Sequence, residues 1–421
     1  MALSCCPEVA LETLAIDVGS QHVGLCRWGA RGLHLLRLPT ESPVDAWPRW
    51  IEALAPTLPY QVIYRCTHPA IRDRHEPRAI AELADRCGAR QLRTIADDLH
   101  ADPASAAARY VARLHRLPII CCAEAGAVTL TAVVQDPRGT VSAFRRFRIE
   151  STSREVSGEV ARWLKAALAA AVKESGLDRA DNVPLICFGG RGPSIAAQLA
   201  DGCGLASFLI PPHAGLFSTI GMFMSDIVLN FEHNLHATDI DIDQLRQAFG
   251  TLMDRASNAI TMEGYDLDDA VCLRIAQMAY AGDDSVEVDC DDLADAPRLV
   301  ARFRAMCSEN ERDAEGSRSI EVRTIRVKAV IETRTADMLP AGSVLHSPKG
   351  TTQPDSNRGF TPPADATVHL RHELIADTKI EGPACVREQY ATTSVPRGWV
   401  AQRTAAGSLL VRRHRSAADV E

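Results

Sequence analysis

The sequence predicts an α/β fold made of two copies of one lobe, followed by a region rich in β-strands. Two observations predict it: the order of apolar segments repeats along the chain, and the composition is that of a globular protein. Of the 421 residues, 46% are hydrophobic and 24% are charged. This composition supplies enough apolar material for two or three domains, each with its own core.

The first copy of the repeat lies in the first hundred residues. Alternating apolar residues predict strands at 12–17, 22–28 and 33–38, and an amphipathic helix follows at 44–55. A strand at 60–65, a helix at 77–87 and a strand at 90–95 come next. The resulting order is β-β-β-α-β-α-β.

The second copy has the same order and begins roughly a hundred residues later. Strands are predicted at 118–122, 127–135 and 140–149, and a long helix at 154–175 begins after the cap-like Ser151, Thr152 and Ser153. A strand at 184–188, a helix at 192–201 and a strand at 206–210 complete it. This layout is similar to the duplicated ribonuclease H-like lobes of the actin-like ATPase fold.

Charge and cysteine content exclude several classes of protein. The net charge of −8 comes from intermingled acids and bases, so neither a nucleic acid nor an anionic membrane is an expected partner. The 13 cysteines contain no C-x-x-C pair, which indicates reduced thiols and a cytoplasmic protein. Because no export signal and no run of about 18 apolar residues is present, we expect neither secretion nor a membrane span. Abundant Ala and Arg indicate a bacterial source.

A stretch in the middle of the chain carries the most specific motif. It runs from Leu185 to Asp226 and contains Gly189-Gly190-Arg191-Gly192-Pro193, followed by Pro211, Pro212, Ala214, Gly215, Ser218 and Gly221. This stretch resembles the hydantoinase/oxoprolinase family, which includes ATP-dependent N-methylhydantoinases, 5-oxoprolinases and acetone carboxylase subunits. Similar support comes from Glu263–Cys290 and from the tail after His369, with Gly382-Pro383-Ala384, Thr392-Thr393 and Gly398-Trp399.

The repeat, the composition and the resemblance together predict a division of the chain into five parts. These are a first lobe at 1–115, a second lobe with the GGRGP turn at 116–262, an α+β region at 263–340, a flexible linker at 341–366 and a β-rich module at 367–421. The chain is shorter than the family's enzymes. Several of their segments are replaced here by the helix at 154–175.

The resemblance also implies a site for ATP and Mg²⁺ between the lobes, built from three loops. In the first loop, Asp17, Gly19 and Ser20 are the candidate ligands, with Asp17 as the candidate metal ligand. The second loop, aligned with Ala123 to Leu130, retains Gly126 and Thr129, whereas Glu124 is one place out of register and is expected to face the opposite side. The third loop is Gly189, Gly190, Arg191 and Gly192.

Most Asp and Thr positions of these loops are replaced, which predicts weakened or lost ATPase chemistry. Asp17 is equally well explained as a residue that caps its own turn. Gly189 and Gly190 are also explained as a tight strand-to-helix turn. No catalytic residue is assigned. A cleft that has lost its ligands and binds no cofactor is the alternative.

Two functions follow from these observations. The first is a subunit of an ATP-dependent amide hydrolase or ketone carboxylase, and the alternative is a non-catalytic scaffold or regulatory subunit of such a complex. The expected partner is a second, unrelated large subunit or a full-length paralogue, and a homo-oligomer stays open. Whether this chain is itself an enzyme is not decided by its residues.

Other clusters favour structural explanations. His233 and His236 are spaced to share one face of a helix, but no acidic pattern nearby completes a metal site, so a solvated helix face is expected. Asp239 to Asp243 is expected to form an acidic helix N-terminus. Cys187 is expected to be a buried apolar group on a core strand.

Overall fold

The computed structural model describes about two-thirds of the chain. The described residues are 13–18, 22–29, 32–39, 61–66, 85, 89, 91–95, 102–126, 129–136, 141–148, 154–177, 183–238, 240–262, 265–281, 283, 285–291, 295–307, 319–332, 345–346 and 362–414. They form two compact units. One comprises Met1–Ser225 with Arg334–Glu421, and the other comprises Asp226–Thr333.

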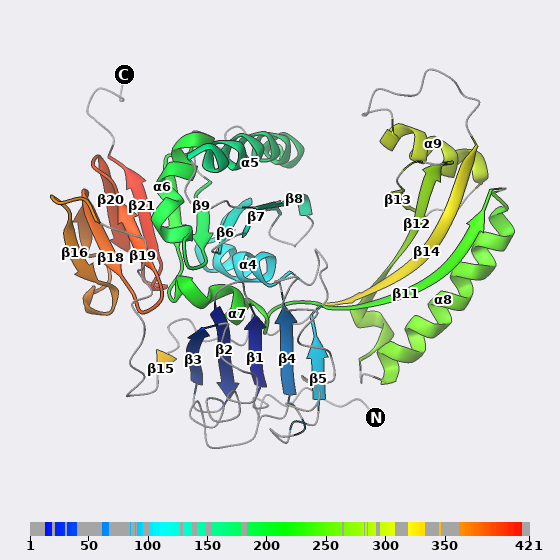
Figure 1. The fold of residues 1–421 in the computed structure, drawn as a ribbon, viewed down its shortest axis with the longest axis horizontal. Coiled ribbons are helices and arrows are strands. Elements are labelled where there is room, and N and C mark those ends of the chain that lie inside the picture. Colours follow the sequence, from blue (N-terminus) through cyan, green and yellow to red (C-terminus); the bar gives the residue numbers. More distant parts are fainter. Residues whose placement is uncertain are drawn as a thin grey trace. The chain divides into compact units, whose positions relative to one another are not determined.

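The first lobe is built on one mixed sheet. Its strands are β1 (Thr13–Val18), β2 (His22–Gly29), β3 (Gly32–Pro39), β4 (Gln61–Cys66), β5 (Gln91–Thr94) and β15 (Leu345–His346), in the order β15-β3-β2-β1-β4-β5. β1 and β2 are antiparallel, whereas β1 and β4 are parallel (Figure 1). The predicted helices at 44–55 and 77–87 lie outside the described residues, except for the helical Asp85.

The second lobe repeats this arrangement. Its strands are β6 (Ile120–Ala125), β7 (Thr129–Gln135), β8 (Val141–Arg148), β9 (Leu185–Phe188) and β10 (Ser207–Ile210), and they lie in the order β10-β9-β6-β7-β8. Numbered from the start of each lobe, both sheets read 3-2-1-4-5. The predicted α/β fold with duplicated ribonuclease H-like lobes is therefore confirmed.

Helices connect and cover the two sheets. They are α4 (Pro103–His115), α5 (Arg154–Ser175), α6 (Gly192–Cys203) and the short α7 (Phe217–Gly221), which follows the 3-10 turn η2 (Ala214–Leu216). α7 contacts β1, β2 and α4. The approach is close, because a Cβ at Gly24 would lie 2.3 Å from Thr219 Oγ1. α4 was not predicted from the sequence, and its first six residues, Pro103 to Ala108, are all buried.

The C-terminal strands extend the second sheet. β17 (Lys379–Glu381), β20 (Trp399–Arg403) and β21 (Leu409–Arg413) continue it beyond β10, because β21 pairs antiparallel with β10. β16 (Thr367–Leu370), β18 (Ala384–Arg387) and β19 (Thr392–Val395) form a separate three-stranded sheet, and η6 (Arg371–Glu373) follows β16. The β-rich module at 367–421 thus shares hydrogen bonds with the second lobe.

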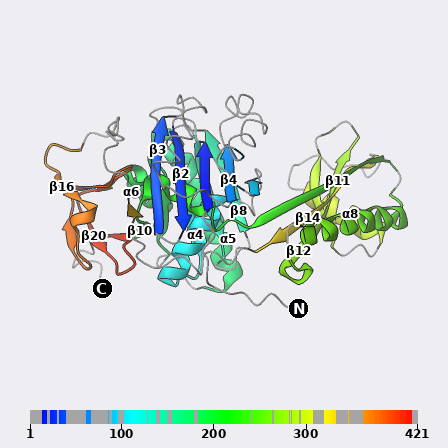
Figure 2. The same cartoon turned by 90° about the horizontal axis from the view of Figure 1, so that it is seen from below.

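The second unit is a four-stranded antiparallel sheet packed against helices. Its strands are β11 (Ile227–Ala237), β14 (Ile320–Ile331), β12 (Ala270–Tyr280) and β13 (Val286–Asp289), in that order. α8 (Ile242–Met262) contacts β11 and β14 along the sheet (Figure 2). α9 (Ala296–Cys307) contacts β13. The 3-10 turn η3 (Leu267–Asp269) precedes β12. A core that includes Phe249, Leu252, Phe303 and Val327 lies between the sheet and the helices.

This unit changes two expectations. His233 and His236 lie on strand β11, where His233 pairs with Ile325 of β14, so the predicted helix face is wrong. The spacing of three residues between the two histidines suggested a helix. In fact both side chains are exposed because β11 is an edge strand. β11 and α8 also belong to the unit from Asp226 to Thr333, whereas the sequence-based division placed them in the second lobe.

Other expectations meet the structure as follows. Asp241 caps α8, because its carboxylate accepts hydrogen bonds from the Asp243 and Gln244 amides, which confirms an acidic helix N-terminus there. Leu345 and His346, inside the predicted linker, pair with β3, whereas residues 347–361 lie outside the described residues. In the described part of the chain, no helix is long and apolar enough to cross a membrane.

Candidate functional site

The two lobes present carboxylates at equivalent strand positions. Asp17 is the fifth residue of β1 and pairs with Gly24 on β2. Glu124 is the fifth residue of β6 and pairs with Thr131 on β7. Asp17-x-Gly19 therefore corresponds to Glu124-x-Gly126. The alignment that began the second loop at Ala123 is shifted by one residue, and such a shift reverses the side on which every side chain of a strand lies.

Glu124 faces the same polar cluster as Asp17, so the expectation that it faces away is wrong. Burial raises the pKa of Glu124 to about 7, against the attraction of Arg65, and the charges of Asp102 and Asp17 add to the rise. Burial also raises the pKa of Asp17, while Arg65 and a hydrogen bond from Ser218 oppose the rise. Both carboxylate residues remain half-buried rather than sealed in the core.

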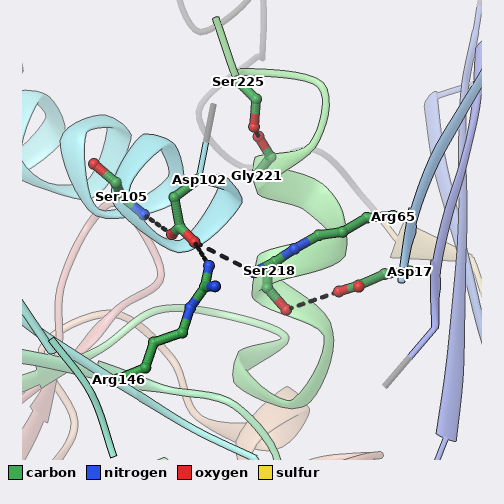
Figure 3. A network of polar contacts seen from close by, with 8 residues as sticks. All are labelled: Asp17, Arg65, Asp102, Ser105, Arg146, Ser218, Gly221 and Ser225. Carbon is green, nitrogen blue, oxygen red and sulfur yellow. Dashed lines mark hydrogen bonds and ion pairs between the residues drawn. The ribbon is translucent and has the colours of Figure 1, made fainter. Parts of the chain in front are cut away.

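Ser218 of α7 links the acids of the cluster. Its hydroxyl donates a hydrogen bond to Asp17 Oδ2 at 3.3 Å (Figure 3). A hydrogen bond from the same side chain opposes the rise in the pKa of Glu124. Because Asp17 belongs to the first lobe and α7 follows the second, this contact joins the lobes at the site.

A third carboxylate, Asp102, organises the cations of the cluster. Its side chain is fully buried, and Oδ2 lies 3.3 Å from Arg65 Nη2 and 3.2 Å from Arg146 Nη2. Its Oδ1 accepts a hydrogen bond from the Ser105 amide, which caps α4 (Figure 3). Since Arg65 lies on β4 and Arg146 on β8, one carboxylate ties both sheets to the helix that connects them.

The GGRGP turn is bound to the end of β6 by its backbone. Gly189 has a φ of +86°, and a Cβ there would lie 2.4 Å from the Ala125 carbonyl oxygen. Its amide donates to Ala214 O at 2.8 Å, and the Arg191 amide donates to Ala125 O at 3.0 Å. The Cys187 thiol, buried as predicted, donates to Gly192 O at 3.3 Å. These amides already have carbonyl partners, which favours the strand-to-helix turn as their role.

The other predicted site residues are distributed as follows. Gly126 and Thr129 close the β6–β7 turn, where the Gly126 amide donates to Thr129 O at 2.9 Å. Gly190 lies beside Arg37 of the first lobe. Gly19 and Ser20 lie outside the described residues. The structure thus brings Gly126, Gly189 and Arg191 together around the end of β6.

Sequence reasoning missed five residues of the site: Arg65, Asp102, Glu124, Arg146 and Ser218. Two of them had a signal. Glu124-x-Gly126 repeats the spacing of Asp17-x-Gly19, and Ser218 belongs to the motif that follows Pro211. The other three are joined only by the fold, because 37 and 44 residues separate Asp102 from its two arginines.

The donor set fits Mg²⁺ that arrives with a nucleotide. Mg²⁺ is commonly held by one or two protein carboxylates, with phosphate oxygens and water completing its octahedron. Asp17 and Glu124 supply two carboxylates. Among the described residues, no group of three or more His, Cys, Asp or Glu side chains could hold an ion alone. Arg65, which attracts both carboxylates, competes with such an ion.

The comparisons with known proteins agree with this arrangement. Residues 124–230 match the family described as Hydantoinase/oxoprolinase. This segment of the chain is similar to the hydantoinase/oxoprolinase family. The matched segment begins at Glu124 and includes the GGRGP turn and Ser218.

The individual relatives of this chain are distant. An uncharacterized protein of Methanocaldococcus jannaschii is 24% identical over 276 residues, which are 63% of this chain and 39% of the relative. The chain therefore spans about two-fifths of the length of that curated relative.

Among solved structures, the ATP-dependent caprolactamase of Pseudomonas jessenii has a TM-score of 0.51 and 13% identity, with 93% of this chain and 82% of that chain covered. A nucleotide-free acetone carboxylase structure has a TM-score of 0.49 and 11% identity, with 96% of this chain and 100% of that chain covered. The likeness to the caprolactamase shows a shared fold.

Gly189→Ala is expected to destabilise the protein by about 3 kcal/mol or more, because it combines a left-handed φ with a clash against Ala125. Gly204→Ala is a matched control: Gly204 has a φ of +76°, but nothing lies within 4 Å of its Cβ position. It should cost about 1 kcal/mol. Urea denaturation measures both, and equal losses would contradict the close packing of the turn on β6.

Asp102→Asn is expected to lower the free energy of unfolding by about 3 kcal/mol, because it leaves two arginines without their shared buried counter-charge. Asparagine still caps α4, so the loss isolates the ion pairs. Asp365→Asn, which breaks an exposed pair with Arg397, is the control and should cost less than about 1 kcal/mol. A loss at Asp102 no larger than at Asp365 would refute the lobe-joining role.

The raised pKa of Glu124 predicts a dependence of stability on pH. Between its ordinary 4.5 and about 7, the folded protein holds a proton that the unfolded chain has released. The free energy of unfolding therefore falls as pH rises through this window and is level above it. Glu124→Gln should remove that fall, so its stability relative to wild type rises by about 2 kcal/mol from pH 5 to pH 8. Denaturant titrations at both pH values test this, and parallel pH curves would contradict it.

Proposed function

We propose that this chain is a subunit of a hydantoinase/oxoprolinase-type ATP-dependent amide hydrolase or ketone carboxylase complex, with weakened ATPase chemistry. The observation that carries the proposal is the pair formed by Asp17 and Glu124. One carboxylate comes from each lobe, at the same position of equivalent strands. This is where the two lobes of the fold would hold a nucleotide and its Mg²⁺.

Each residue of the site has a role in this proposal. Asp17 and Glu124 hold Mg²⁺, directly or through water, and ATP supplies the phosphoryl group that activates a substrate. Arg65 balances the charge of the two carboxylates when the site is empty. Ser218 orients Asp17 through its hydrogen bond. Gly19 and Ser20 complete the first loop, and Gly190, Arg191 and Gly192 lie toward the adenosine, as the family resemblance implies.

Weakened chemistry is supported by how the backbone amides are used. Three amides of the loops, at Gly126, Gly189 and Arg191, donate to carbonyl groups of the protein. They are not available to neutralise phosphate oxygens, and that neutralisation supplies much of the rate in phosphoryl transfer. The positive charge of Arg65 partly neutralises Asp17 and Glu124, which weakens their attraction for Mg²⁺. The site is therefore better suited to binding a nucleotide than to fast hydrolysis.

The same observation favours the second candidate, a non-catalytic scaffold or regulatory subunit. Its fold and partner surfaces would be those of the family, while the chemistry resides in a second, unrelated large subunit or in a full-length paralogue. The two candidates differ in whether this chain binds Mg-ATP.

Thermal and chemical denaturation with Mg-ATP separates them. Saturation at about a hundred times Kd should raise the free energy of unfolding by about 2.7 kcal/mol. Asp17→Asn and Glu124→Gln should each abolish the gain, whereas Asp365→Asn on the exposed surface should retain it. If millimolar Mg-ATP gives no gain in stability and a large partner subunit is recovered from the native host, the scaffold proposal would be favoured over the enzyme-subunit proposal. Recovery of this chain alone would contradict both.

A further inference from the structure

A short loop of the C-terminal module reaches both lobes. This bridging loop, Glu388–Ala391, connects β18 to β19 and is closed by a hydrogen bond from the Glu388 amide to Ala391 O at 2.9 Å. Tyr390 is buried, and the Glu388 side chain is 8% exposed. β19, which follows the loop, packs beside α6, the helix that follows the GGRGP turn (Figure 1). The loop is therefore fixed next to the candidate site.

Glu388 connects the bridging loop to the GGRGP turn through one intermediate residue. Its Oε2 accepts a hydrogen bond from the Ala214 amide at 3.2 Å, and Ala214 O accepts one from the Gly189 amide at 2.8 Å. Glu388 Oε1 is paired with the buried Arg371, which also donates to Ile210 O and Gly407 O, each at 2.9 Å. The carboxylate is thus anchored on one side and holds the turn on the other.

Tyr390 connects the bridging loop to the first lobe. Its carbonyl oxygen accepts a hydrogen bond from Arg37 Nη1 at 3.1 Å, and the guanidinium lies 5.8 Å from the centre of the Tyr390 ring. Arg37 also borders the GGRGP turn, since a Cβ at Gly190 would lie 3.2 Å from Arg37 Nη2. Tyr390 packs as closely on the second lobe, where a Cβ at Gly215 would lie 2.3 Å from Tyr390 O.

We propose that the bridging loop positions the GGRGP turn and Arg37 relative to each other, so that the C-terminal module controls the geometry of the site between the lobes. Glu388 and Arg37 are positioning residues in this arrangement. A partner that displaces the module would release the turn, and a ligand that orders the turn would strengthen the attachment of the module. The effect on ligand binding rests on the proposed function, whereas the positioning is a property of the ligand-free protein.

Hydrogen exchange of the full chain tests the positioning without a ligand. In Arg37→Gln and Glu388→Gln, amide exchange in peptides covering 185–203 should accelerate about tenfold, while peptides of the unit from Asp226 to Thr333 keep wild-type rates. Arg37→Lys keeps the cation and should restore slow exchange. Arg397→Gln, which breaks an exposed ion pair in the same module, is the matched control and should change nothing.

Two results would overturn the proposal. One is an unchanged rate of amide exchange at 185–203 in folded Arg37→Gln. This result would refute the positioning role even if Glu388→Gln fails to fold because Arg371 loses its partner. The other is equal acceleration in every part of the chain, which would indicate a general loss of stability. A second measurement, the Kd for Mg-ATP, should rise about tenfold in Arg37→Gln and recover in Arg37→Lys. Absence of Mg-ATP binding to wild type would refute the proposed function, and the exchange result would still decide the positioning.

Discussion

The ion pairs of the Asp102 carboxylate are the interaction on which the site between the lobes depends. A buried carboxylate is stable only when it is paired and hydrogen-bonded, and Asp102 has two arginines and the amide of Ser105. One arginine comes from each sheet, and Asp102 itself caps the helix that connects the lobes. Arg65 is also the cation that faces Asp17 and Glu124, so the position of the positive charge in the site is set by Asp102.

The duplication explains why two carboxylates face one cluster. Equivalent strands end at equivalent places in the two lobes, so a residue that faces inward from β1 has a counterpart that faces inward from β6. Burial raises the pKa of both carboxyl groups, and the single Arg65 that faces them only partly opposes the rise. Such a pair attracts a cation more than it attracts phosphate. Binding of a nucleotide in this site would therefore require its metal ion, because three of the loop amides already donate hydrogen bonds to carbonyl groups of the protein.

Much of the fold could be predicted from the sequence, because it depends on local patterns. The strands of both lobes and the helix at 154–175 match the observed elements closely, since alternation and helical periodicity record which face is buried. The site was less predictable for physical reasons. A one-residue error of register moved Glu124 to the wrong side, and Arg65, Asp102 and Arg146 carry no spacing that indicates their ion pairs. α4 was not predicted, and its first half, Pro103 to Ala108, consists of small residues that are all buried.

The path of the chain makes the candidate site a property of the whole larger unit. The chain leaves this unit after Ser225 and returns at Arg334. β21 then pairs with β10, and Tyr390 meets Arg37 across 353 residues of sequence. The GGRGP turn precedes β10 and contacts Ala214, which the returning segment holds through Glu388. Contacts of such long range form only when the chain between them is closed, and the entropy of that closure opposes them. The third loop is therefore held, through Ala214 and Glu388, by a contact across 174 residues of sequence, whereas the β6–β7 turn is closed by the local hydrogen bond from the Gly126 amide to Thr129 O.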